Sequence, residues 1–242
     1  MTEQGQQRVA IVTGAGRGIG REIALALARR GFALCITARS RGELEETRRL
    51  SGLKASCSLI VLADLAHEDA PDQLFGAALD HFGRLDLLVN NAGWAPARTP
   101  LVKLRPADEA RMLAVNLRAP IALTRMAAAQ MERQKEGAII NIASSAARSP
   151  GAGEAVYAAA KAGLIAFTYA CFHEFRRCGI KMSVIIPGLV DTALIPANKR
   201  LNRAAMLTAA DVAAAVMTIV NSPPHVNPVE IALEPQRDPF DR

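Results

Sequence analysis

The chain alternates between short apolar runs and longer stretches in which apolar residues recur at helical spacing. The apolar runs are rich in β-branched residues and have the length of buried strands. They cover residues 8–13, 32–38, 57–63, 85–89, 138–143, 181–186 and 229–233. The stretches with helical spacing lie between them and cover residues 21–31, 43–50, 70–82, 107–135, 156–177 and 207–220. Alternation of this kind predicts a parallel sheet that is covered by helices on both faces.

The chain has no internal repeat, low-complexity segment or linker that would divide it. At 242 residues it is long enough to bury one substantial core. We therefore predict one dinucleotide-binding and catalytic domain over residues 1–242, a Rossmann-type α/β fold with a doubly wound parallel sheet of about seven strands. Ligands of such folds bind outside the carboxyl ends of the strands. Residues 193–206, before the last helix, are expected to form a short lid over the substrate.

Charge and composition exclude some function classes. The formal charge is +6 and the pI about 9.5, but aromatic residues make up only 4% and no basic block stands out. A nucleic-acid binder would need basic patches with stacking platforms, so the charge favours an enzyme whose cofactor or substrate is anionic. The polar start MTEQGQQR has no signal-peptide core, and no apolar run reaches the ~18 residues of a membrane span. We expect a cytoplasmic protein with no nucleic-acid or membrane partner.

The cysteines and histidines give no sign of a metal centre. The four cysteines include no C-x-x-C pair and no paired framework, which is typical of reduced thiols in a cytosolic protein. The four histidines lack the spacing of metal ligands, and we therefore predict no metal site.

A glycine-rich loop joins the first predicted strand to the first helix. Residues 14–20 read GAGRGIG, and glycines allow the backbone to approach a pyrophosphate closely. The helix that follows offers unpaired N–H groups and the positive end of its dipole to the same group. A tight turn without a ligand would need fewer than the four glycines found here. The loop therefore predicts a dinucleotide site that includes Gly14, Gly16, Arg17, Gly18, Ile19 and Gly20.

The end of the second strand indicates which dinucleotide binds. An NAD site usually has an acid here for the ribose 2′-hydroxyl, but this chain has Ala38 and Arg39. A cation suits a 2′-phosphate, and Arg17 in the glycine loop is a second candidate. We therefore predict NADP as the cofactor. NAD is the alternative if both arginines are solvated surface residues.

Two further strands end in residues that suit a bound dinucleotide. Asp64 follows the third strand and is expected at the adenine pocket. The fourth strand runs into 90–93, NNAG, where small residues let the backbone lie against a flat ring. Trp94 follows directly and is expected either as a pocket wall or as part of the core.

Residues 141–161 contain a pair that suits acid/base chemistry. Tyr157 and Lys161 are separated by three alanines, and helical positions i and i+4 lie on one face. An ammonium at ~5–6 Å, with an effective dielectric of ~20, favours the phenolate by roughly 3 kcal/mol and so lowers the pKa of the tyrosine. This makes Tyr157 a candidate general acid/base, the alternative being a surface tyrosine on an alanine-rich helix. Ser144, at the end of an apolar run, is placed to donate a hydrogen bond to a substrate oxygen.

Asn116 lies inside the helical stretch 107–135, and Pro120 follows four residues later. Asparagine is unfavourable inside a helix, so a local role is expected. The missing N–H of Pro120 removes one helical bond to the Asn116 carbonyl, which is then free to hold a water.

The motifs stand in the order TGAGRGIG at 13–20, Asp64, NNAG at 90–93, Asn116, Ser144, Y-x-x-x-K at 157–161 and PGLVDT at 187–192. In order and spacing they resemble the short-chain dehydrogenase/reductase family along almost the whole chain. The resemblance implies a catalytic tetrad of Asn116, Ser144, Tyr157 and Lys161. It implies a cofactor site in which the glycine loop and Arg39 are joined by Asp64, Leu65, Asn91, Ala92, Gly93, Tyr157, Lys161, Pro187, Gly188, Val190 and Thr192.

The resemblance also implies a reaction class. The expected enzyme is an NADP(H)-dependent oxidoreductase that moves a hydride between nicotinamide and a carbonyl or secondary alcohol. It resembles 3-oxoacyl-[acyl-carrier-protein] reductases, so an acyl carrier protein or a CoA thioester is a candidate partner, and a small ketone, sugar or polyol dehydrogenase is the alternative. A non-catalytic dinucleotide sensor would not need the tetrad, and an epimerase or dehydratase would need further acid/base groups.

The substrate pocket is predicted from Ser144, Trp94, Glu154, Leu189 and Leu194. Three lid cations, unless they are solvated, would attract an anionic substrate; they are Lys199, Arg200 and Arg203. Further cations that an acidic carrier protein would meet are Arg133, Lys135, Arg176 and Arg177. The single acid, Glu154, would instead favour a sugar or polyol, and because the cations outnumber it a 3-oxoacyl thioester is the favoured substrate.

Subunit assembly is predicted from the two long helical stretches 107–135 and 156–177. They carry more apolar surface than one sheet face can cover, and the resemblance implies that subunits pair through them. We expect a homotetramer or a homodimer. Two departures from the family pattern, the short lid and an end without aspartate–diglycine, bear on the substrate and on subunit packing.

Overall fold

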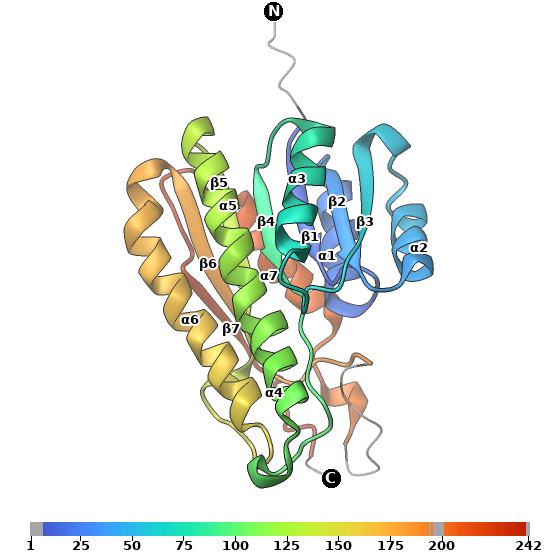
Figure 1. Cartoon of the computed structure of the whole chain (residues 1–242), viewed down its shortest axis with the longest axis vertical. Helices are drawn as coiled ribbons and strands as arrows, with labels where there is room; N and C mark the ends of the chain where they lie inside the picture. The colour runs from blue at the N-terminus through green and yellow to red at the C-terminus, as the bar shows by residue number, and fades with distance from the viewer. Residues whose placement is uncertain (1–6, 194, 196–200, 241–242) are drawn as a thin grey trace, which may run out of the picture.

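Seven parallel strands form one sheet in the computed structural model, which describes residues 7–193, 195 and 201–240. They are β1 (Val9–Thr13), β2 (Ala33–Ala38), β3 (Ser58–Leu62), β4 (Leu87–Asn90), β5 (Gly137–Ile142), β6 (Ile180–Pro187) and β7 (Glu230–Leu233). Their order in the sheet is β3-β2-β1-β4-β5-β6-β7 (Figure 1). The winding reverses between β1 and β4, and ligands of doubly wound sheets bind outside the carboxyl ends of the strands at such a point.

Helices cover both faces of this sheet. They are α1 (Gly18–Arg29), α2 (Arg41–Ser51), α3 (Ala70–Phe82), α4 (Pro106–Leu113), α5 (Ala119–Gln134), α6 (Ala155–Phe175) and α7 (Ala209–Asn221). One apolar core lies under α1, α2 and α7, and the other lies under α3, α5 and α6. Figure 1 views the sheet from the side of the second group. This arrangement confirms the α/β fold class that the alternating pattern predicts.

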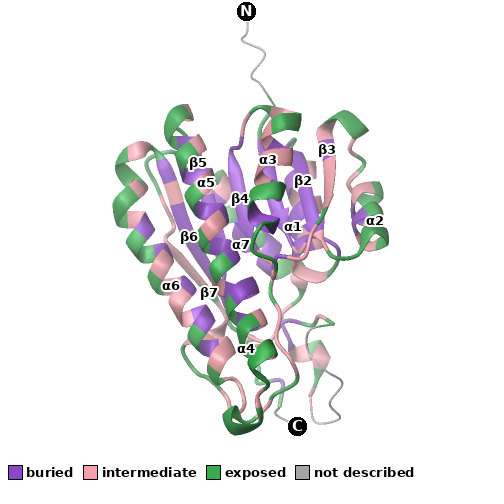
Figure 2. Cartoon of the chain, viewed as in Figure 1, coloured by how far each residue is buried: buried purple, intermediate pink, exposed green. Residues whose placement is uncertain are grey.

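The five inner strands are buried on both faces, which is why they read as continuous apolar runs, whereas the edge strands β3 and β7 are only partly buried. In β1, Ala10 and Val12 belong to the first core, whereas Val9 and Ile11 belong to the second. Successive side chains of a strand point to opposite faces, so one short run supplies both cores. Figure 2 shows the buried strands in purple between helices whose outer sides are exposed.

The ends of the helices follow local capping signals. Thr208 caps α7: its hydroxyl accepts from the N–H of Asp211 at 3.2 Å, and the Asp211 carboxylate accepts from the N–H of Thr208 at 2.7 Å. Both residues therefore open this helix as a reciprocal capping box. After α1, Gly31 adopts a φ of +85°, a left-handed conformation that favours glycine and ends the helix.

The helical stretch predicted over 107–135 is divided by a π-helical turn at Ala114–Arg118, between α4 and α5. Pro120 has no N–H to donate, so the regular helical ladder cannot continue unchanged through this point. Turns of this kind are frequent at functional sites. Asn116 lies inside the turn and is completely buried.

The expectation that no apolar stretch reaches the length of a membrane span does not hold for α6. Together with the short turn after it, Ala155–Cys178, the helix is long and apolar enough by composition to cross a membrane, although only 33% of its apolar window is buried. One such helix is weak evidence for a membrane, because packed helices of soluble proteins pass the same test. In this fold α6 packs against β6 and contributes to the core that it shares with α3 and α5.

Buried polar side chains join α6 to the centre of the sheet. The amide of Asn90 donates to the side-chain oxygen of Asn141 at 2.9 Å, and the amide of Asn141 donates to the hydroxyl of Thr168 at 2.8 Å. Thr168 in turn donates to the carbonyl of Leu164 at 2.7 Å. A buried network of this kind stabilises the fold only as long as its members remain paired.

Thr168→Val is expected to lower the free energy of unfolding by about 1–3 kcal/mol, because it leaves the buried amide of Asn141 without an acceptor. Thr218→Val is the matched control, since exposed Thr218 makes the same bond to the carbonyl four residues earlier, that of Ala214. The control is expected to change the stability by less than about 0.5 kcal/mol. Chemical denaturation at one fixed protein concentration measures the free energy of unfolding of both variants. Equal losses of stability in the two variants would contradict a stabilising role of the buried network.

Candidate active site

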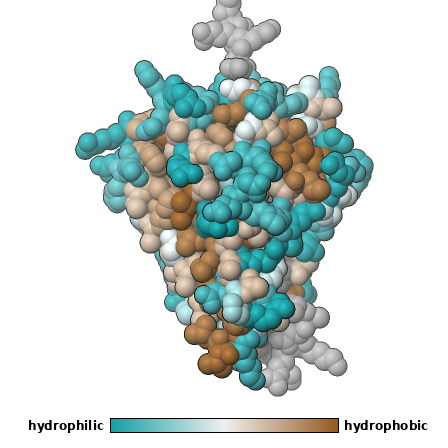
Figure 3. All heavy atoms as spheres, viewed as in Figure 1, coloured by the Kyte–Doolittle hydropathy of each residue, from teal (hydrophilic) through white to brown (hydrophobic). Residues whose placement is uncertain are grey.

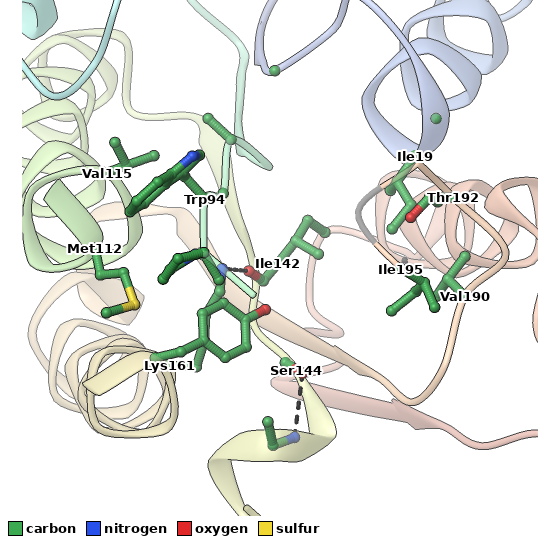
Figure 4. A pocket seen from close by; sticks show the side chains of 18 of the residues that line it. Ile19, Trp94, Met112, Val115, Ile142, Ser144, Lys161, Val190, Thr192 and Ile195 are labelled. Carbon is green, nitrogen blue, oxygen red and sulfur yellow. Dashed lines mark hydrogen bonds between the residues drawn. The ribbon is translucent and has the colours of Figure 1, made fainter. Parts of the chain in front are cut away.

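A cleft of about 1130 Å³ is lined by the segments that follow the carboxyl ends of β1 to β6. Nearly every predicted site residue lines it. The exceptions are Asn116, which lies behind the wall of the cleft, and Leu194, which lies outside the described residues. Figure 4 shows side chains from two facing sides of the cleft, with Ile19 and Thr192 on one side and Trp94 and Lys161 on the other.

The glycine loop is pressed against the segment that follows β4. Gly14 has a φ of +66°, and a Cβ at this position would lie only 2.9 Å from the Cα of Ala92. A Cβ on Gly20 would overlap the carbonyl oxygen of Gly14. Asn91 fastens the two segments, because its amide donates to the carbonyl of Thr13 at 2.8 Å. These contacts require glycine at both positions.

The free groups around this loop fit a dinucleotide. Helix α1 begins at Gly18 with no side-chain cap from Arg17 and no acid in its first turn, so its N–H groups can receive a diphosphate. The hydroxyl of Thr37, at the end of β2, is buried in the cleft lining and has no hydrogen-bond partner among the described residues. Unpaired buried hydroxyls are uncommon, and a ligand hydroxyl or phosphate would satisfy this one.

Charged side chains in the cleft lining are mostly paired with one another. The pairs are Arg17 with Glu43 at 3.8 Å, Arg111 with Asp64 at 2.7 Å and Arg98 with Glu154 at 2.8 Å. Arg39 differs, because its guanidinium makes no hydrogen bond or ion pair within the described ranges. Its charge acts on the carboxylate of Asp64 without a direct contact, so its N–H donors are available to a ligand.

Helix α6 carries Tyr157 and Lys161 into the other end of the cleft. The Lys161 side chain is 3% exposed, and its amino group donates to the carbonyl of Ile142 at 2.8 Å. The same nitrogen lies 5.9 Å from the centroid of the Tyr157 ring. Ser144 stands at the end of β5, where its hydroxyl accepts from the N–H of Ala146 at 3.2 Å.

Burial sets the ionisation of this pair. It lowers the pKa of the Lys161 ammonium to about 8. Burial also raises the pKa of the Tyr157 phenol; a hydrogen bond with Ser144 opposes this shift, and the negative charge of Glu154 adds to it. The expectation that Lys161 lowers the pKa of Tyr157 is therefore wrong for the protein without cofactor. The physical reason is that desolvation of the half-buried phenol outweighs the favourable contacts of the phenolate.

The side chain of Asn116 is hydrogen-bonded to backbone groups of Trp94 and Met112. Its amide donates to the carbonyl of Trp94 at 2.6 Å and to the carbonyl of Met112 at 2.9 Å. Its side-chain oxygen accepts from the N–H of Trp94 at 3.3 Å. Asn116 thus fixes the backbone of Trp94, whose ring lines the cleft beside Met112 and Val115 (Figure 4). Of the two alternatives for Trp94, the pocket wall is the one observed.

Two residues expected to select the substrate are already engaged. One carboxylate oxygen of Glu154 accepts from Arg98, and the other accepts from the N–H of Gly151 at 2.7 Å. Arg203 is ion-paired with Asp191 and also donates to the carbonyl of Ile195 at 2.6 Å. Neither side chain offers a free charge to a substrate. The other two lid cations, Lys199 and Arg200, lie outside the described residues.

Several cleft residues were not predicted from the sequence. They include Thr37, Glu43, Arg98, Arg111 and Phe240. Glu43, Arg98 and Arg111 carried no local signal, because their charge partners come from distant segments. Thr37 reads as one more residue of a buried strand. Phe240 lies in the unusual C-terminal end, and that departure from the family pattern was the one signal available.

Comparisons with known proteins agree with this geometry. The family model described as short chain dehydrogenase matches residues 8–202. An uncharacterized oxidoreductase of Staphylococcus epidermidis is 31% identical over 230 residues, which are 95% of this chain and 98% of that protein. A 3-oxoacyl-[acyl-carrier-protein] reductase of Synechocystis is 37% identical over 186 residues, covering 76% of this chain and 75% of that protein.

Solved structures give the same result. A metagenomic short-chain oxidoreductase in complex with NADP has a TM-score of 0.82 and 32% identity, covering 95% of this chain and 98% of that chain. A 3-ketoacyl-(acyl-carrier-protein) reductase from Brucella melitensis complexed with NADH has a TM-score of 0.85 and 28% identity, with the same coverage. The family and the enzyme class predicted from the motifs are confirmed. The chain belongs to the short chain dehydrogenase family and is an oxidoreductase.

Proposed function

We propose that the protein is a cytoplasmic, single-domain NADP(H)-dependent reductase of carbonyl groups, with 3-oxoacyl thioesters as its favoured substrates. One observation carries the proposal: Tyr157, Lys161 and Ser144 meet at one end of a cleft whose other end is a glycine loop beside an uncommitted arginine, Arg39. A dehydrogenase of small ketones, sugars or polyols is the alternative.

The cofactor site is assigned to chain segments at the carboxyl ends of the strands. The N-terminus of α1 would hold the diphosphate, Asp64 and Leu65 the adenine, and Lys161 and Thr192 the nicotinamide end. When bound, the nicotinamide supplies or accepts the hydride. The close approach allowed by Gly14 and Gly20 supports this assignment.

Tyr157 is assigned the role of general acid. A tyrosine phenol is protonated at neutral pH, and burial, which raises the pKa of Tyr157, disfavours the phenolate further; the phenol therefore begins a reduction with the proton that the substrate oxygen needs. Ser144 is placed to donate to the same oxygen and to stabilise the charge that develops there. The phenolate left behind would face Lys161, which is mostly protonated at neutral pH because its pKa is about 8. Asn116 holds the Trp94 wall beside this pair.

The preference for NADP(H) is supported by Arg39. Its guanidinium is uncommitted within the described ranges, whereas the charge of Arg17 is shared with Glu43. Three related structures were solved with NADP, NADP+ or 5-hydroxy-NADP and one with NADH, so NAD remains the alternative.

The thioester preference is supported by apolar lining and by relatives. Leu189, Ile195, Leu201 and Phe240 are apolar residues of the cleft lining. Since Arg98 and Gly151 already engage Glu154, this acid offers little to a polyol. Two relatives are a 3-oxoacyl-[acyl-carrier-protein] reductase and a (2S)-[(R)-hydroxy(phenyl)methyl]succinyl-CoA dehydrogenase subunit of Thauera aromatica, the latter 36% identical over 189 residues.

Tyr157→Phe is expected to lower kcat by about 10²–10⁴-fold for the reduction of an acetoacetyl thioester, because it removes the proton donor. Binding of NADPH, followed by fluorescence, is expected to stay within about twofold of the parent, since the ring itself remains. Tyr169→Phe is the matched control: it removes an exposed phenol from the same helix and is expected to leave kcat unchanged. Activity of Tyr157→Phe within tenfold of the parent would refute the role of the phenol.

The same assay, applied to the parent enzyme, distinguishes the two substrate classes. A higher kcat/KM for acetoacetyl or longer 3-oxoacyl thioesters than for small ketones and polyols supports the proposal. Activity confined to polyols or sugars would overturn the thioester assignment while leaving the proton donor in place.

Arg39→Ala is expected to lower the ratio of kcat/KM with NADPH to kcat/KM with NADH by about 10- to 150-fold, because a hydrogen bond to a charged group contributes roughly 1.5–3 kcal/mol. Arg41→Ala is the control, since Arg41 is a neighbouring exposed arginine whose guanidinium lies 4.0 Å from Glu45. An unchanged ratio in Arg39→Ala, or a parent that prefers NADH, would contradict the assignment.

We also propose a homotetramer or homodimer that pairs through α5 and α6. Exposed apolar side chains on this side include Leu113, Ile121 and Tyr169, which are 38–39% exposed. Figure 3 shows apolar atoms gathered over the two helices. A second copy of the chain would cover this surface. Light scattering at micromolar concentration is expected to give a multiple of the 25.8 kDa chain mass, and a one-chain mass would reject the proposal.

A further inference from the structure

Arg111 is a cleft residue to which the proposed chemistry gives no role. It lies on α4, and its side chain reaches the end of β3, where it donates to the carboxylate of Asp64 at 2.7 Å. The two side chains are only 27% and 26% exposed, so water screens this pair less than it screens a surface ion pair. Both residues line the cleft.

The second neighbour of Arg111 is the indole of Trp94. The central carbon of the guanidinium lies 5.3 Å from the centroid of the ring, within the range of a cation–π contact. The backbone of Trp94 is held from the other side by the buried side chain of Asn116. Arg111 therefore joins the end of β3 to the wall beside the catalytic residues.

The carboxylate of Asp64 is fixed at both oxygens. One accepts from Arg111, and the other accepts from the N–H of Ala66 at 3.1 Å. A carboxylate held in this way keeps lone pairs that point in set directions and can accept a bond from an amino group. Fixed acceptors discriminate ligands strongly, because a ligand that offers another acceptor at the same place leaves both groups unpaired.

We propose that Arg111 is a positioning residue for the adenine end of the cofactor site, which makes the site selective for a 6-amino purine. It does so by holding the acceptor atoms of Asp64 and by bracing Trp94. This inference rests on the proposed function, because it requires a dinucleotide in the cleft. A salt bridge that only braced the fold would give no selectivity for the base.

The test compares NADPH with its hypoxanthine analogue, in which a carbonyl replaces the adenine amino group. The variants are Arg111→Met, which removes the charge at similar length, and Arg111→Lys, which keeps the charge without the planar fork. Arg105→Met is the matched control. Arg105 directly precedes α4 and, like Arg111, is ion-paired with an acid, Asp108, but its side chain is exposed and does not line the cleft. Trp94 is the one tryptophan of the chain, so its emission reports on this wall directly.

The parent is expected to bind NADPH about tenfold or more tightly than the hypoxanthine analogue, the discrimination that one hydrogen bond to a charged group provides. In Arg111→Met the ratio should fall towards one, and the emission of Trp94 should change before any cofactor is added. The affinity ratio of Arg111→Lys should lie between the ratios of the parent and of Arg111→Met. The ratio of Arg105→Met should match that of the parent.

An unchanged base ratio in Arg111→Met would overturn the proposal, including the case in which only the melting temperature falls. A parent that binds NADPH without discriminating against hypoxanthine would overturn it as well. If the parent binds neither dinucleotide, the proposed function itself fails. The emission of cofactor-free Arg111→Met then still tests the contact with Trp94, and an emission equal to that of the parent would refute the bracing role too.

Discussion

The buried amino group of Lys161 is the constraint on which the site depends. A cation is costly to remove from water, and this one is 3% exposed with a pKa lowered to about 8. It is tolerated because the carbonyl of Ile142, at the carboxyl end of β5, accepts a hydrogen bond from it at 2.8 Å. Strand β5 and helix α6 must therefore keep one relative position. The same constraint positions Tyr157, because it lies one helical turn before Lys161 on the same face of α6.

The fold meets this requirement at two consecutive residues of β5. The carbonyl of Ile142 holds Lys161, and the side chain of Asn141 holds Thr168, two turns further along α6. Both buried residues lie on the face of α6 that packs towards the sheet. A helix fixed at two points cannot slide or rotate without breaking a buried polar contact, and each broken contact costs the desolvation of a group. The polar network of the core and the candidate catalytic pair are thus parts of one arrangement.

The sequence predicted what is encoded locally. The strands follow from apolar runs, the glycine loop follows from its spacing, and Tyr157 and Lys161 share a face because they are four residues apart. It did not predict contacts between distant segments: Arg111 and Asp64 are 47 residues apart, and Arg98 and Glu154 are 56. The ionisation of Tyr157 was predicted with the wrong sign, because it depends on how deeply packing buries the phenol and on Glu154, neither of which follows from spacing along a helix.

The most direct test of this account is the titration of the Tyr157 phenol in the cofactor-free protein. The chain has two tyrosines, so Tyr169→Phe leaves Tyr157 as the one phenol whose ultraviolet absorbance changes with pH. The account predicts a pKa above the ordinary value of about 10, with circular dichroism confirming that the protein stays folded over the titration. A phenol that titrates at or below this ordinary value would contradict the claim that burial disfavours the Tyr157 phenolate in the cofactor-free protein.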